Sequence, residues 1–248
     1  MQKKAVSAKS LSLSKLPTEV LLSTPVSKIL ATTAPKAKRI SRAIKVIEKE
    51  LTLKNISLPI EFYYGDEWFT ADGTISISIP FFLTHKKLIQ LEKKFLNEAE
   101  GDEYSYLLKL IRHEVGHCII HAFKLSRRKD WQCLFGSSLK KYDPDHYTPN
   151  PKSKSHVQNL KNHYGQAHPE EDFAETFAVW LNPKSNWRKK YKTRPHAYHK
   201  LLYLEKISTL LTQTKKIHIE SSTIYSAERM SIPLWKYLVK KLKNKMTP

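Results

Sequence analysis

The chain lacks features that mark several protein classes. It has only two cysteines in 248 residues, Cys118 and Cys133, which is too few for a disulfide framework and favours a reducing compartment. No uninterrupted apolar run is long enough to cross a bilayer, and polar residues interrupt the N-terminus too often for a signal peptide. We therefore expect a cytoplasmic protein without a transmembrane segment.

Acidic residues are scarce at both ends of the chain. The formal net charge is +20, of which residues 1–57 carry +9 and residues 184–248 carry +13, while residues 58–183 carry −2. Basic flanks of this kind attract polyanions such as nucleic acid or an anionic lipid surface. In the C-terminal range, 184–248, aromatic side chains interleave with the cations and could stack on bases: Trp187, Tyr191 and Tyr198.

A five-residue motif, His113-Glu114-Val115-Gly116-His117, is the most informative stretch. Two imidazoles four residues apart on a helix can lean toward one metal ion, and the intervening Glu114 can take a proton from a metal-bound water. The apolar spacing before and after the motif predicts a buried helix over 103–122. Gly116 costs stability inside a helix, so we expect it to leave room for a close neighbour or a metal-bound substrate, unless the helix simply tolerates it.

Zinc in a catalytic site usually has three protein ligands, so a third is needed. A second helix is predicted from Pro169 to Leu181, and its apolar spacing places Glu171 and Glu175 together on a face suited to close packing. We expect Glu171 to bind the metal and Glu175 to accept the Nδ1–H of a ligating histidine.

Other ligand sets remain open on the sequence alone. Asp172 ranks second to Glu171, and His121 is too far along its helix to share an ion with His113, so it is expected to support the site or lie on the surface. A histidine could also supply the third ligand, as in SprT-like proteases. The candidates are His146, His156, His163 and His168.

The combination of these motifs resembles a known family. HEVGH followed by YGQAHPEEDFAETFAVWL, with similarity over 58–92 and 127–153, resembles a bacterial family of zinc-binding metallopeptidases and the gluzincin pattern HExxH...E. More remotely, the chain is similar to lethal-factor-type peptidases. The resemblance covers roughly 58–205. It implies zinc as the cofactor, with His113, His117 and Glu171 as ligands.

The same resemblance assigns a role to Tyr164. It matches a tyrosine that assists at the transition state, and a phenolic O–H aimed at a developing oxyanion makes chemical sense there. The implied activity is a zinc metallopeptidase that hydrolyses peptide bonds of a peptide or protein substrate with Glu114 as general base. The alternative is a basic nucleic-acid-associated protein whose zinc site is structural or degenerate.

The remaining pattern predicts the organisation of the chain. We expect a flexible basic tail over 1–37, a zincin-like domain over 38–212 and a basic helical extension over 213–248. The domain is expected to be α+β, with a small sheet, the active-site helix and C-terminal helices. Strands are predicted at 58–64 and 74–79, and the second, half-buried strand is a candidate edge for pairing with a peptide substrate. Further helices are predicted over 37–53, 87–98, 196–212 and 235–245.

Overall fold

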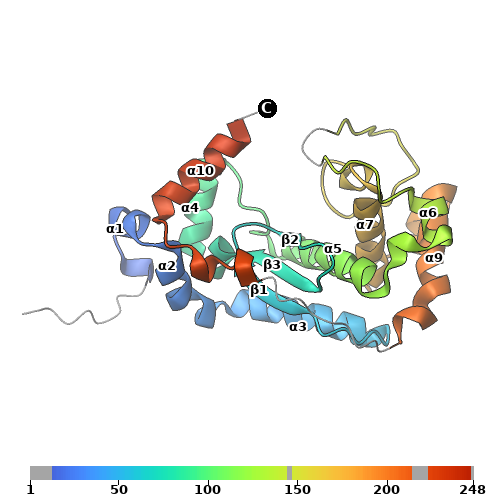
Figure 1. Ribbon diagram of the computed structural model, residues 1–248, viewed down its shortest axis with the longest axis horizontal. Coiled ribbons are helices and arrows are strands. Elements are labelled where there is room, and N and C mark those ends of the chain that lie inside the picture. The colour runs from blue at the N-terminus through green and yellow to red at the C-terminus, as the bar shows by residue number, and fades with distance from the viewer. Residues whose placement is uncertain (1–12, 144–146, 214–222, 247–248) are drawn as a thin grey trace, which may run out of the picture.

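The computed structural model describes residues 13–143, 147–213 and 223–246, and it is a mixed α+β structure (Figure 1). The predicted helices are confirmed to within a few residues at their ends. The helices are α1 (Thr18–Ser23), α2 (Val26–Thr33), α3 (Lys38–Leu53), α4 (Lys86–Leu96), α5 (Tyr104–Phe123), α6 (Lys129–Phe135), α7 (Pro169–Leu181), α8 (Trp187–Tyr191), α9 (Pro195–Leu211) and α10 (Leu234–Met246). The strands are β1 (Glu61–Gly65), β2 (Phe69–Thr70) and β3 (Ser76–Pro80).

The sheet has the order β1-β3-β2, with β1 parallel and β2 antiparallel to β3. The predicted strand at 74–79 is therefore the centre of the sheet, so the prediction that it is the free edge is wrong. It is also buried on both faces instead of one. Ser76 and Ser78 tolerate burial because their hydroxyls donate to Glu61 Oε2 at 3.0 Å and to the carbonyl of Glu67 at 2.6 Å.

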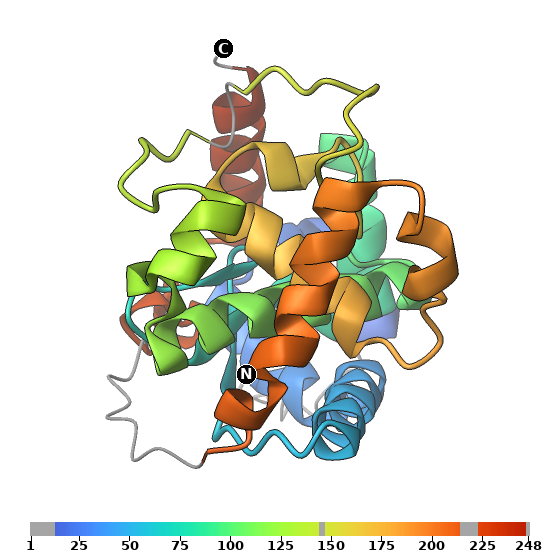
Figure 2. The same ribbon diagram turned by 90° about the vertical axis from the view of Figure 1, so that its right-hand side faces the viewer.

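Helix α5 runs through the middle of the molecule. It packs on α3 along one side, on the sheet along another and on α7 near its C-terminal half (Figure 1). A buried ion pair ties it to α3, because Arg112 donates two 2.7 Å hydrogen bonds to the Glu50 carboxylate. Viewed from the right-hand side of Figure 1, α9 lies across the face that α6 and α7 share (Figure 2). Helix α6 falls within residues 123–163, for which the turn signals Asp143-Pro144 and Asn150-Pro151 in the sequence predict a region rich in loops.

The N-terminal segment differs from the flexible tail predicted over 1–37. From residue 13 on it is largely helical, and α1 and α2 pack into the core through Leu21, Val26, Ile29 and Leu30. Each such side chain contributes roughly 1.5–3 kcal/mol when buried, which orders a segment whose overall composition is polar. Residues 1–12 lie outside the described part of the chain.

The C-terminal segment packs against the N-terminal segment. Pro25 and Pro233 form a β-bridge, the amide of Val26 donates to the carbonyl of Ile232, and α10 packs on α1 and α4. The described residues 13–37 and 223–246 thus pack on the central region, while the division of the chain at residues 38 and 212 stays a prediction. In the described part of the chain, none of the helices has the length and apolar character that a membrane span requires.

Candidate metal centre

Helix α5 presents the first three candidate residues. His113 and His117 lie one turn apart, with Nε2 atoms 3.2 Å from each other, and Glu114, which follows His113 in the sequence, is buried. The helix can carry these polar groups because its other faces supply core residues such as Val115 and Ile119, which are fully buried.

Helix α7 presents the fourth candidate residue, Glu171. It begins sharply because the His168 side chain accepts the amide N–H of Glu170 and Pro169 occupies the first helical position. The two helices cross very closely: a Cβ added to Gly116 would lie 2.7 Å from the Cα of Ala174. The small residues at the crossing therefore bring the carboxylate of Glu171 to the imidazoles of α5, as the expected role of Gly116 requires.

Three potential ligand atoms converge between the helices. Glu171 Oε2 lies 2.8 Å from His113 Nε2 and 3.4 Å from His117 Nε2, and this group could hold a metal ion. Ligands placed tetrahedrally at about 2.0 Å from zinc are separated by roughly 3.3 Å, close to the separations found here. The donor set and its spacing therefore fit a zinc ion.

Glu175, one turn beyond Glu171, orients His113. Its Oε1 lies 3.0 Å from His113 Nδ1, while Oε2 accepts the backbone N–H groups of Asn159 and Leu160, each at 2.7 Å. A charged, fully buried carboxylate is tolerated because these donors replace its hydration. When His113 Nδ1–H donates to Glu175, the Nε2 lone pair faces Glu171, so the site calls for a cation between them.

The pKa shifts of His113 and Glu171 also favour a cation between these side chains. Burial alone lowers the pKa of His113, but the hydrogen bonds and charges of Glu171 and Glu175 outweigh burial and raise that pKa well above its usual value. Burial would raise the pKa of Glu171, yet His117 and His113 hold it well below its usual range. The carboxylates thus stabilise a positive charge at the point where the Nε2 atoms meet.

The side chain of Glu114 is held in place by a hydrogen bond from the sheet. The hydroxyl of Thr70, on edge strand β2, donates to Glu114 Oε2 at 2.9 Å. Burial raises the pKa of Glu114, although the nearby charges of His117 and His113 and the Thr70 hydrogen bond lower it. Sequence reasoning missed Thr70, because a single threonine in a short strand carries no pattern that points to a helix over 40 residues away.

Tyr164 begins a short 3-10 helix before α7, and its ring lies 5.7 Å from that of His113. A second tyrosine joins it. The hydroxyl of Tyr142 donates to Glu171 Oε1 at 2.8 Å and lies 3.2 Å from the Tyr164 hydroxyl. Burial and the charge of Glu171 raise the pKa values of both phenols, so both keep their protons. Tyr142 lies in a predicted loop and could not have been singled out.

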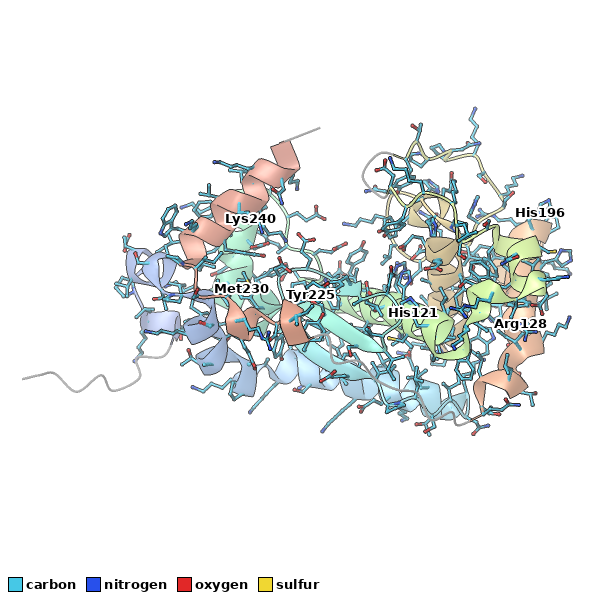
Figure 3. The ribbon with its side chains drawn as sticks, viewed as in Figure 1. His121, Arg128, His196, Tyr225, Met230 and Lys240 are labelled. Atoms are coloured by element: carbon cyan, nitrogen blue, oxygen red, sulfur yellow. The ribbon has the colours of Figure 1, made fainter. Side chains whose placement is uncertain are left out.

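A cleft of about 1300 Å³ contains the candidate centre. Its walls come from β2 and the following turn, α5, and the segments before α7, and Tyr225 from the C-terminal region lines it as well. Figure 3 shows Tyr225 beside the sheet and His121 farther along α5. Tyr225 packs against Phe69 of β2, with ring centroids 5.2 Å apart. The cleft is open to solvent.

The other candidate ligands lie elsewhere. His121 Nδ1 lies 2.9 Å from the carbonyl of Thr74, and His168 caps α7. His156 lies near Asp172, which is buried and paired with Lys200 at 2.5 Å, so Asp172 is engaged away from the imidazole pair. His163 precedes Tyr164 in a left-handed conformation. His146 falls outside the described residues.

The aromatic residues proposed to stack on bases are not available for this role. Trp187 and Tyr191 are buried, and Trp187 packs on Tyr198 with ring centroids 5.7 Å apart. Their cationic neighbours remain exposed on α8, but the arrangement provides no stacking platform. The prediction of base stacking by this segment is therefore wrong, because the aromatic side chains belong to the core.

The family model described as "Putative zinc-binding metallo-peptidase" matches residues 72–224, more than half of the chain. The chain belongs to this metallopeptidase family. The match includes α5, α7 and the segment between them, and it reaches the residue before Tyr225. No curated protein and no solved structure compared with the chain is significantly similar to it.

Proposed function

We propose that this member of the metallopeptidase family is a zinc-dependent peptidase of the gluzincin type, with a zincin-like catalytic domain. One observation carries the proposal: His113, His117 and Glu171 converge in the lining of an open cleft, with Glu114 and Tyr164 lining the same cleft. The proposed substrate is a peptide or a protein.

The proposed ligands to zinc are His113, His117 and Glu171. Bound there, zinc would polarise the scissile carbonyl and make water acidic enough to be deprotonated near neutral pH. Glu175 acts on the centre indirectly: its hydrogen bond to His113 Nδ1 fixes the tautomer that leaves Nε2 free to ligate.

Glu114 is the proposed general base. Its carboxylate takes a proton from the attacking water and can pass it to the leaving amine, and the raised pKa brings it closer to the working pH. Thr70 donates to Oε2, which keeps the side chain in one rotamer and leaves Oε1 for the proton. Thr70 is thus a positioning residue supplied by the sheet edge.

Tyr164 and Tyr142 have different proposed roles. We assign Tyr164 the role of donor to the oxyanion that develops on the scissile carbonyl. Tyr142 holds Glu171 through Oε1 and lies beside the Tyr164 hydroxyl, so it links the ligand carboxylate to the oxyanion donor. Both hydroxyls come from segments that precede α7.

We also propose a cellular compartment and a contact with polyanions. Cys118 and Cys133 are both free thiols, which supports a reducing compartment such as the cytoplasm. The basic flanks remain a proposed site of weak polyanion contact through charge alone.

The deciding experiment compares the native protein with Glu114→Gln and with Glu103→Gln, an exposed control at the start of the same helix. Zinc content is measured together with cleavage of a fluorescently labelled casein. We expect about one zinc per chain in all three and a loss of at least about 10²-fold in cleavage rate for Glu114→Gln alone. Undiminished cleavage by Glu114→Gln would reject the mechanism.

A second comparison tests the ligand set. Glu171→Ala should lose zinc, whereas His156→Asn and His168→Asn should keep it, because their side chains lie outside the converging group. Zinc retention by Glu171→Ala together with loss in a histidine variant would favour a centre with three histidines. Comparison of new protein N-termini in cells with native protein or Glu114→Gln would then identify substrates.

A further inference from the structure

A second pocket, of about 360 Å³, lies against the segment that carries Tyr164. It is lined by residues 151–154, by 156–158, and by His163, Gln166 and Arg194. The segment also supplies the N–H groups of Asn159 and Leu160 that hold Glu175. The pocket is therefore adjacent to two of the supports of the candidate metal centre, although it does not include any residue assigned to catalysis.

The lining of this pocket carries positive charge. Lys152, Lys154 and Arg194 contribute three cations, and no aspartate or glutamate is among its described lining residues. In the described part of the chain, none of these three cations forms an ion pair. The guanidinium of Arg194 lies over the Tyr191 ring, 5.7 Å from its centroid, and this contact holds it in place at the pocket wall.

Neutral donors complete the lining. His156 is half-buried, and burial together with the charges of Lys200, His163 and Lys140 lowers its pKa to about 4. It is therefore uncharged near neutral pH and can donate one N–H. Among the described residues, His156 has one acidic ion-pair partner, Asp172, which lies 3.9 Å from its Nε2 and is already paired with Lys200.

Backbone geometry marks the same place. Asn162 and His163 are consecutive residues with φ of 59° and 54°, a left-handed conformation that side chains with a Cβ rarely adopt. Nearby, Gln166 clamps the turn at Asn150 by two hydrogen bonds, of 2.8 and 3.0 Å. An unusual turn is thus held beside an uncompensated cationic pocket.

We propose that this pocket binds the phosphoryl group of a small molecule, with Arg194 as its principal ligand. A guanidinium matches a tetrahedral oxyanion by two parallel N–H donors, and the lysines add charge. The bound anion would contact His163 next to Tyr164 and the segment that leads to Asn159. It would therefore restrain the part of the chain that supports the metal centre.

The binding test uses the full chain in metal-free form, so that phosphate cannot bind at zinc. Inorganic phosphate and pyrophosphate are titrated separately by calorimetry at constant ionic strength. We expect one saturable site per chain, weakened about tenfold or more by Arg194→Gln. The matched control, Lys189→Gln, removes the same charge from an exposed position on α8. Tighter binding of pyrophosphate would indicate a diphosphoryl ligand.

The contradicting results are equally specific. Absence of saturation, or equal weakening by Arg194→Gln and Lys189→Gln, would show only general attraction to a basic protein and overturn the proposal. The restraint is tested by hydrogen exchange with mass spectrometry, where phosphate should slow exchange in peptides covering 152–166 in native protein but not in Arg194→Gln. Unchanged exchange on saturable binding would overturn the proposed restraint and retain the site.

Discussion

Replacement of Gly116 by alanine tests the close crossing of α5 and α7. The added Cβ would lie 2.7 Å from the Cα and 3.2 Å from the carbonyl oxygen of Ala174, both backbone atoms that cannot rotate away. Ordinary contacts begin near 3.4 Å, so the helices must separate by about 0.7 Å. The site is thus sensitive to the smallest possible side chain.

Two opposing effects set the stability change. Alanine favours the helix over glycine by about 1 kcal/mol, whereas overpacking a buried contact costs about 1–3 kcal/mol. We expect Gly116→Ala to lower the free energy of unfolding by roughly 0–2 kcal/mol. Urea denaturation of metal-free protein measures this difference.

The effect on zinc should exceed the effect on stability. Glu171 lies one turn before Ala174 on α7, and metal sites tolerate changes in ligand distance of only about 0.2 Å. We expect zinc affinity, measured by competition with a chromophoric chelator, to fall about 10–100-fold, as it does when the surroundings of metal ligands are disturbed.

Gly165→Ala is the matched control. Its added Cβ would also face α7, but at 3.4 Å from the Cα of Asp172 and the Cγ of Glu175, which is an ordinary contact. We expect its stability to change by less than about 0.5 kcal/mol and its zinc affinity to stay the same. If Gly116→Ala were about 1 kcal/mol more stable than native and bound zinc normally, helix propensity alone would act there and the described crossing would be refuted.

Three further predictions follow from buried charges. Glu175→Gln should weaken zinc binding about 10–100-fold in the same chelator assay, because the amide loses the charge that supports the ligating imidazole; unchanged affinity would contradict this. Arg112→Leu should destabilise the protein to urea by about 3–5 kcal/mol because it leaves Glu50 buried without its partner, and Arg112→Leu with Glu50→Leu should recover much of this loss. Burial raises the pKa of Glu92 to about 7, so the folded state retains a proton that the unfolded state loses between pH 4.5 and 7. Stability from this group is therefore complete below pH 4.5 and falls by up to about 3 kcal/mol as pH rises to 7, a decline that denaturation of Glu92→Gln should lack.

Much of the secondary structure could be predicted from the sequence because its signals are local. Helix α7 extends over the predicted residues Pro169–Leu181, since proline, the acidic first turn and the asparagine that follows act within a few residues of each end. The spacing of His113 and His117 and the shared face of Glu171 and Glu175 are likewise properties of single helices. The same local logic failed for residues 13–37, where a few apolar side chains find partners far along the chain.

Contacts between distant segments were beyond such reasoning. Alternation of isoleucine and serine predicted the strand at 74–79, but its place at the centre of the sheet depends on β1 and β2 pairing on either side. The sequence left open whether the aromatic residues near residue 190 stack on bases, and the packing places Trp187 and Tyr191 in the core.

The sequence by itself therefore determined the six longer helices α3, α4, α5, α7, α9 and α10, and which imidazoles and carboxylates share a face, because the periodicity of a helix specifies direction within one element. Only the tertiary structure decided that Thr70 holds Glu114, that Tyr142 holds Glu171, and that two loop amides hold Glu175. Those supports join residues 15 to 44 positions apart. These contacts form only when the helices and the sheet pack together, so no local sequence pattern predicts them.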